Sequence, residues 1–133
     1  MVYKNKIHSS RSEGIFIIEG GFCWIKSNQI YDNNDGIIMF DSYPHLTENN
    51  IHMNQRAGII ACGNSFPKVE KNDICGNSMA GIVVRHNSFC TILNNRIFSN
   101  FYQISARNLN QKQRKQIIDD NEINGENEFL YTC

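Results

Sequence analysis

One phrase recurs along the chain at intervals of 21 to 23 residues, and it constrains the fold more than any other feature. The phrase is clearest from Asn72 to Val84, where an Asn-x-Ile triplet, a second Asn and a Gly-Ile pair follow one another. The Asn-x-Ile triplet begins at Asn5, Asn28, Asn49, Asn72, Asn95 and, after a longer interval, Asn121. A chain that repeats one phrase at such an interval is typical of a stack of identical units.

Each repeat carries three short apolar segments that are too short to pair as hairpins within the repeat. Each segment must therefore pair in parallel and in register with its copy in the next repeat, which advances about 4.8 Å per coil. The sequence predicts an all-β, right-handed parallel β-helix of about five to six coils. A leucine-rich repeat has an overlapping period, but it needs Leu-x-x-Leu-x-Leu, and here the aliphatic residues are mostly Ile and Val.

The aligned columns predict which side chains build the coil. Three interior ladders are expected, formed by Ile7, Ile30, Ile51, Ile74 and Ile97, by Ile15, Ile37, Ile59, Ile82 and Ile104, and by Ile25, Leu46, Val69 and Ile92. Turn ladders of stacked amides are expected at Asn28, Asn49, Asn72 and Asn95, because Asn tolerates the left-handed region and its amide can bond along the axis. A corner that needs positive φ or has no room for Cβ is expected at Gly36, Gly58 and Gly81.

The repeat divides the chain into three parts. Residues 1–107 form the β-helix coils, residues 108–116 a polar basic loop, and residues 117–133 a partial last coil and tail without a clear capping helix. Ile117 and Ile118 are expected to rejoin the stack. Two alternatives stay open: the chain is a segment of a larger β-helix, or a partner caps it.

Charge and cysteine content limit the partners and the compartment. The net charge is zero and the pI is near 6.9, so no strong field would attract nucleic acid or an anionic membrane. No stretch approaches the roughly 20 apolar residues that span a bilayer. The five cysteines, Cys23, Cys62, Cys75, Cys90 and Cys133, include no Cys-x-x-Cys pair. Cys23 and Cys90 share a column but lie about 14 Å apart, too far for a disulfide. We expect reduced, mostly buried thiols and a cytoplasmic location, with cytoskeletal, ciliary and nuclear sites left open.

No constellation in the sequence predicts chemistry. The acidic residues are scattered among columns, with Asp35 in an Asn-rich turn and no pair stacked beside a Lys or Arg, so we predict no catalytic residue. His8 and His52 share a column with Tyr31 between them and lie too far apart to bind one metal ion, so we predict no metal and no cofactor. The aromatic column Phe22, Tyr43, Phe66 and Phe89 suggests an interior stack or a corner more than a sugar platform. The basic run from Lys112 to Lys115 is read as a solvated loop.

The most informative surface column comes from the Gly-Ile strand. If its isoleucines point inward, alternation directs the following residues outward. The predicted apolar stripe consists of Phe16, Ile38, Ile60 and Val83. Exposed stripes of this extent mark docking surfaces, although β-branched residues also favour strands in general.

The phrase Asn-x-Ile-x-x-Asn-x-x-x-Gly-Ile resembles the parallel β-helix repeat of the carbohydrate-binding-protein-and-sugar-hydrolase class, over Asn5 to about Ala106. It is most similar to eukaryotic non-enzymatic members, the F-box proteins that carry a β-helix and the Shc-binding proteins. A bacterial periplasmic protein for copper insertion has similar repeats, and pectin-degrading hydrolases, lyases and alginate epimerases share the fold class. The resemblance implies a non-catalytic interaction or scaffold module in a eukaryotic intracellular assembly, cytoskeletal, ciliary or ubiquitin-ligase, whose partners are other proteins. A carbohydrate-binding or polysaccharide-degrading β-helix is the alternative.

Overall fold

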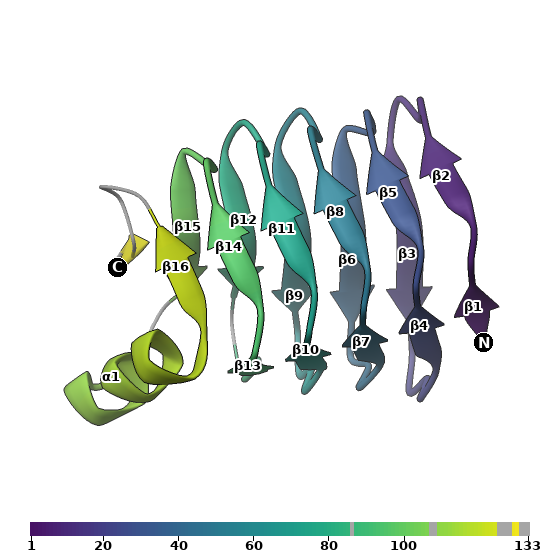
Figure 1. Cartoon of the computed structure of the whole chain (residues 1–133). Helices are drawn as coiled ribbons and strands as arrows, with labels where there is room; N and C mark the ends of the chain where they lie inside the picture. The colour runs from purple at the N-terminus through teal and green to yellow at the C-terminus, as the bar shows by residue number, and fades with distance from the viewer. Residues whose placement is uncertain (86, 107–108, 125–128, 131–133) are drawn as a thin grey trace.

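The computed structural model is a parallel β-solenoid, as the repeat predicts, and it describes residues 1–85, 87–106, 109–124 and 129–130. Every strand pairs in parallel with the equivalent strand of the neighbouring coil, so the coils stack along one axis from the N-terminus to the C-terminus (Figure 1).

Sheet A contains β1 (Val2–Tyr3), β4 (Trp24–Lys26), β7 (His45–Thr47), β10 (Lys68–Glu70) and β13 (Thr91–Leu93). Sheet B contains β2 (Lys6–His8), β5 (Gln29–Tyr31), β8 (Asn50–His52), β11 (Asp73–Cys75), β14 (Arg96–Phe98) and β16 (Glu122–Asn124). Sheet C contains β3 (Glu13–Ile18), β6 (Asp35–Phe40), β9 (Ala57–Cys62), β12 (Ala80–Val84), β15 (Tyr102–Ala106) and β17 (Phe129–Leu130).

The three predicted apolar ladders form the core. Ile30, Ile51, Ile74 and Ile97 pair in register along sheet B and are completely buried. The predicted ladder isoleucines of sheet C and the aliphatic residues of sheet A join the same cluster. In the first coil, Ile7 and Ile15 are half-buried, because the described chain places a neighbouring coil on one side of them only.

The predicted asparagine ladder is present, and each of its amides connects three coils. The backbone N–H and the Nδ2 of Asn49 both donate to Oδ1 of Asn72 in the next coil, at 2.9 and 3.0 Å. The same Nδ2 donates to the carbonyl of Ile25 in the preceding coil, at 2.8 Å. A second ladder of this kind runs through Asn33, Asn54, Asn77 and Asn100. Because these amides are buried, their hydrogen bonds satisfy polar groups that would otherwise be costly.

The residues with left-handed backbone lie one position before the ladder asparagines, the residues for which this conformation was predicted. The residues that precede the ladder asparagines, Ser27, Glu48, Lys71 and Asn94, have φ of 57° or 58°. The glycines of the repeat serve the other purpose that was expected of them, since they leave no room for a side chain. A Cβ on Gly58 would lie 2.7 Å from the carbonyl oxygen of Gly81 and 3.0 Å from Nδ2 of Asn77.

Helix α1 (Gln111–Asp120) corrects the prediction of a loop at residues 108–116 and of Ile117 and Ile118 rejoining the stack as a strand. A capping box starts the helix: Oδ1 of Asn110 accepts the N–H of Gln113 at 2.8 Å, and Oε1 of Gln113 accepts the N–H of Asn110 at 2.9 Å. The first six residues of the helix are Gln, Lys and Arg, which are good helix formers without β-branches. Residues 107, 108, 125–128 and 131–133 of the predicted coil, loop and tail lie outside the described residues.

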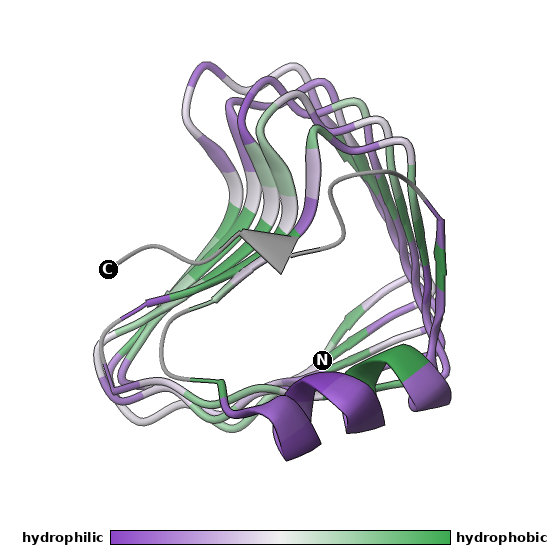
Figure 2. Cartoon of the chain, turned by 90° about the vertical axis from the view of Figure 1, so that its left-hand side faces the viewer, coloured by the Kyte–Doolittle hydropathy of each residue, from purple (hydrophilic) through white to green (hydrophobic). Residues whose placement is uncertain are grey.

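The helix takes the place of a sheet A strand in the last coil. It lies beside β13 and packs the buried Ile117 against the core (Figures 1 and 2). The carbonyl of Asp120 accepts the N–H of Asn94 at 2.6 Å, and Asn121 continues the asparagine ladder. The chain then returns to sheet B as β16.

Candidate interaction surfaces

The predicted stripe lies in register on the outer face of sheet C, but only one of its residues is well exposed. Phe16 is 54% exposed and Ile38 is half-buried, whereas Ile60 and Val83 are 1% and 3% exposed. Figure 2 shows that the side of the coil formed by sheet C is indented. The expectation of an exposed stripe is therefore wrong at Ile60 and Val83. Ile60 lies at the floor of a concave groove, and Val83 packs in the same cluster.

The repeat glycine explains why these outward residues are buried. A Cβ on Gly58 would point at Ile74 and Asn77, toward the interior of the coil. The side chain of the next residue also points inward, so strict alternation fails at this position. Ala57 and Ile60 consequently share the outer face and pack in one small cluster with Cys62, Ala80 and Val83. The strands bend at the glycine, and the side chains on either side of the bend bury one another.

The concave groove has a volume of about 330 Å³ and combines an apolar floor with charged residues of both signs. Its lining includes Glu13, Asp35, Ile38, Arg56 and Arg85. Oδ1 of the buried Asp35 accepts the N–H of Ala57 at 3.1 Å, and its Oδ2 lies 3.8 Å from Nη1 of Arg56. The groove has the size of a small ligand site.

Sequence reasoning missed the carboxylate pair in this groove. Glu13 and Asp35 are register partners on adjacent coils with Arg56 nearby, contrary to the expectation that no acidic pair stacks beside a basic residue. Each of the two acids directly precedes a repeat glycine, so the column alignment contained the signal. The hydrogen bond from the Ser12 hydroxyl lowers the pKa of Glu13, which keeps this carboxyl ionised at neutral pH.

The aromatic column lies at the corner between sheets C and A, and its side chains point outward. Phe22, Tyr43, Phe66 and Phe89 are 56%, 49%, 56% and 46% exposed. The interior positions belong to the residues that follow them, of which Cys90 is buried. Of the two predictions, the corner is therefore correct and the interior stack is wrong.

Trp24 widens the apolar surface at the first two coils. Its ring meets that of Phe22 edge-on at 6.1 Å and lies 4.2 Å from that of His45. Phe22 and Tyr43 have ring centroids 6.2 Å apart with a tilt of 31°. We define Phe22, Trp24, Tyr43, Phe66 and Phe89 as the aromatic corner.

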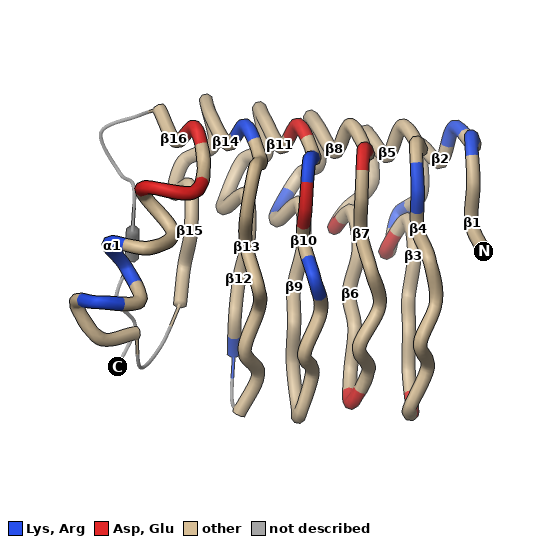
Figure 3. The backbone as a smooth tube through the Cα atoms, turned by 60° about the horizontal axis from the view of Figure 1, so that its bottom comes forward, with Lys and Arg blue, Asp and Glu red and all other residues tan. Residues whose placement is uncertain are grey.

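Two of the histidines, His8 and His52, form a surface ladder with Tyr31. His8, Tyr31 and His52 stack on sheet B with centroids 4.9 and 5.0 Å apart, in the predicted column. His45 contacts Glu70 at 3.1 Å, and His86 lies outside the described residues. Charged residues of both signs are interspersed along the solenoid (Figure 3). Within the described ranges, no group of three His, Cys, Asp or Glu side chains is arranged to hold a metal ion.

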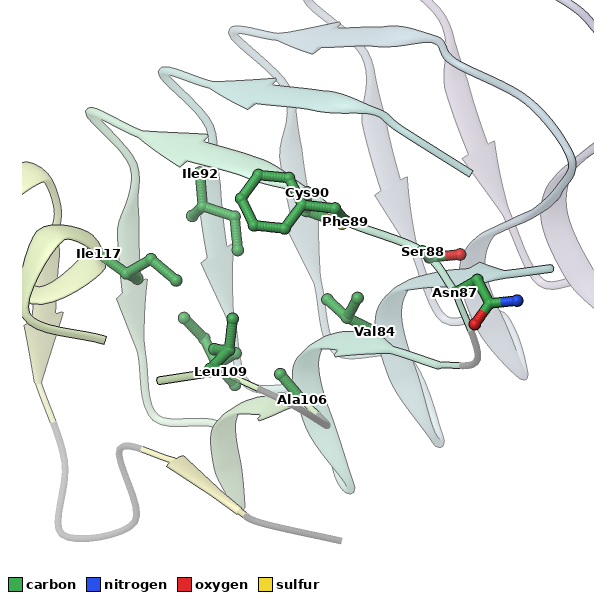
Figure 4. Close-up of a pocket in the computed structure, with 10 residues that line it drawn as sticks. Val84, Asn87, Ser88, Phe89, Cys90, Ile92, Ala106, Leu109 and Ile117 are labelled. Carbon is green, nitrogen blue, oxygen red and sulfur yellow. The ribbon is translucent and has the colours of Figure 1, made fainter. Parts of the chain in front are cut away.

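The four described cysteines, Cys23, Cys62, Cys75 and Cys90, are free thiols, as expected, and Cys133 lies outside the described residues. Burial raises the pKa of Cys90 to about 12. Cys90 lines a cavity of about 240 Å³ together with Val84, Ile92, Leu109 and Ile117 (Figure 4). This cavity lies where helix α1 replaces a strand, because a helix does not fill the interior as a further coil would.

The comparison with protein families agrees with this architecture. A family model described as the right-handed beta helix region matches residues 1–123. No curated protein and no solved structure matches the chain significantly. No helix in the described part of the chain is long and apolar enough to span a lipid bilayer.

Proposed function

The chain belongs to the right-handed β-helix family, and we propose that it is a non-catalytic member that binds another protein through the aromatic corner. The observation that carries this proposal is the exposure of five aromatic side chains on one edge of a regular scaffold. Contiguous apolar patches on soluble proteins usually mark interaction sites, and aromatic residues are enriched in interfaces and their hot spots.

The scaffold supports such a role because it holds its surface residues in fixed positions. Two buried asparagine ladders and three apolar ladders join every coil to its neighbours. A preorganised surface loses little conformational entropy on binding. The proposal includes a eukaryotic intracellular assembly, cytoskeletal, ciliary or ubiquitin-ligase, and the free thiols Cys23, Cys62, Cys75 and Cys90 are consistent with a reducing compartment.

A carbohydrate-active β-helix is the second candidate, and the pair Glu13 and Asp35 in the concave groove favours it. Glycoside hydrolysis needs a carboxylic acid that is protonated near neutral pH, which enzymes obtain by raising its pKa. Here the Ser12 hydroxyl lowers the pKa of Glu13. Asp35 accepts the N–H of Ala57 and lies 3.8 Å from Nη1 of Arg56, so both of its carboxylate oxygens are already engaged within the chain. These contacts support the non-catalytic proposal over hydrolysis.

The proposal is tested by affinity capture from the native cells with matched variants of the full chain. Tyr43→Ser combined with Phe66→Ser removes two rungs of the aromatic corner. Phe101→Ser removes an aromatic ring of similar exposure, 58%, from the turn between sheets B and C. We expect one set of proteins to be captured by the wild type and by Phe101→Ser and to be lost with the double variant. Equal capture by all three would contradict the proposal.

The enzymatic candidate has its own measurement. Release of reducing ends from polyuronates, lost in Glu13→Gln and Asp35→Asn, would establish catalysis and overturn the non-catalytic proposal. We expect no release above background from the wild type.

A further inference from the structure

The rungs of the aromatic corner repeat at the spacing of the coils. The four column residues Phe22, Tyr43, Phe66 and Phe89 each lie two positions before a register-paired strand residue, namely Trp24, His45, Lys68 and Thr91. Backbone hydrogen bonds of 2.9 to 3.2 Å also connect neighbouring coils at the corner itself, at Tyr43, Phe66 and Phe89. The backbones of neighbouring rungs are therefore separated by about 4.8 Å along the axis, and those of every second rung by about 9.6 Å. The ring centroids of Phe22 and Tyr43 are 6.2 Å apart.

This spacing selects among the regular conformations of a bound peptide. A polyproline II helix rises about 3.1 Å per residue with three residues per turn, so one of its edges recurs every 9.3 Å or so. The length of one turn of this helix and the spacing of every second rung differ by only about 0.3 Å. An extended strand presents the same face every 6.8 Å or so, which matches neither one coil nor two.

Two donors at the corner are free to bind such a peptide. Within the described part of the chain, neither the indole N–H of Trp24 nor the hydroxyl of Tyr43 has a hydrogen-bond partner. A polyproline II helix makes no internal hydrogen bonds, so its carbonyl groups are available as acceptors. Aromatic side chains with a polar tip suit this contact, because the ring packs on proline while the N–H or O–H reaches a carbonyl.

We infer that the aromatic corner binds a proline-rich segment of a partner protein in the polyproline II conformation, aligned with the solenoid axis. Prolines pack against the outward surfaces of the rings of Phe22, Tyr43, Phe66 and Phe89, and Trp24 and Tyr43 donate to the ligand's carbonyls. This inference rests on the proposed function and names the chemistry of its partner.

The test is a titration of the full chain with decaproline, followed by the emission of Trp24, the single tryptophan of the chain, and by calorimetry. We expect saturable binding, and none of a Gly/Ser decapeptide. Phe66→Ser should weaken binding about fivefold or more, as for a hot-spot residue, whereas Phe101→Ser should leave it unchanged. Phe66→Leu keeps an apolar side chain at this position, so it provides a folded comparison if Phe66→Ser melts at a lower temperature.

Three outcomes overturn the inference. Decaproline does not bind by either measurement, or it binds equally to wild type and Phe66→Leu, or cellohexaose binds in its place with the same dependence on Phe66. The last outcome would identify a sugar platform. If decaproline fails while capture of cellular proteins still depends on Tyr43 and Phe66, the proposed function stands and only the polyproline ligand is wrong.

Discussion

Gln103 ends the second asparagine ladder by giving Asn100 the oxygen that an asparagine of a further coil would supply. The Nδ2 and the backbone N–H of Asn100 donate to Oε1 of Gln103, at 3.0 and 3.3 Å, and Nε2 of Gln103 donates to the carbonyl of Asn100 at 2.9 Å. Gln103 lies in the glycine column, where its side chain occupies space that a further coil would otherwise need. In the fifth copy of the repeat, Gln103 therefore replaces the repeat glycine, and this glutamine supplies the hydrogen bonds that the last amide of the ladder needs.

Replacing Gln103 by Leu should lower the free energy of unfolding by about 2 kcal/mol or more, because it leaves buried donors of Asn100 without a partner. Urea denaturation measures this loss. Gln29→Leu is the control, since Gln29 is exposed on β5, and it should change the value by less than about 0.5 kcal/mol. Equal values for the two variants would contradict the role of Gln103.

Lysine substitutions distinguish the floor of the concave groove from its edge. Ile60→Lys buries a charge among Ala57, Cys62 and Val83 and should destabilise the protein by more than about 4 kcal/mol. Phe16→Lys, at a side chain that is 54% exposed, should cost about 1 kcal/mol or less. Thermal melting monitored by circular dichroism compares the two. A mild effect at Ile60 would show that the stripe is open to solvent.

Asn110→Ala should cost about 1 kcal/mol, because it removes the N-cap of helix α1 and the reciprocal bond to Gln113. Gln116→Ala, in the middle of the same helix and exposed, serves as the control and should be neutral. Urea denaturation of both variants provides the measurement. If Asn110→Ala is as neutral as the control, residues 111–120 are not held by this cap.

Cys90 should make the protein less stable at alkaline pH. Burial raises the pKa of its thiol to about 12, so above pH 9 the unfolded chain loses the proton while the folded chain retains it. The unfolded state then binds fewer protons, and the free energy of unfolding falls as pH rises, with a slope approaching about 1.4 kcal/mol per pH unit from this group.

The measurement is urea denaturation between pH 8 and pH 10.5, for the wild type and Cys90→Ala. Other groups titrate in both proteins, so the difference between the two curves isolates Cys90. The wild type should lose its stability advantage as pH rises. Parallel curves would mean that the thiol titrates equally in the folded and the unfolded chain, as a solvent-accessible thiol would.

The architecture could be predicted because the same residue types recur in the same columns. Every coil carries the residues of the Ile and Asn ladders, so a copy that departs from the pattern can still be aligned with the others. Burial on the outer face could not be predicted from alternation, because the bend at Gly58 is a property of several adjacent strands. Helix α1 was missed because it occurs once, and its capping signal, Asn110 with Gln113, lies outside the repeat.

The two surfaces also differ in what their columns reveal. The aromatic column was correctly located at a corner, but its exposure depends on the inward orientation of the residue that follows each ring. The pairing of Glu13 with Asp35 needed only the alignment of residues that precede the repeat glycine. The contacts of Glu13 with Ser12 and of Asp35 with Arg56 require the folded coil.

The distance along the chain to the next ladder asparagine is six residues for each of Phe22, Tyr43, Phe66 and Phe89, whereas the connections that flank sheet C vary in length. Each ring is therefore tied to a hydrogen-bonded amide and keeps its place even where a coil is shorter. The rings along this edge therefore recur once per coil, at intervals set by the rise of one coil. Each added coil would contribute one more ring, so the length of a repetitive ligand that the edge can hold is set by the number of coils.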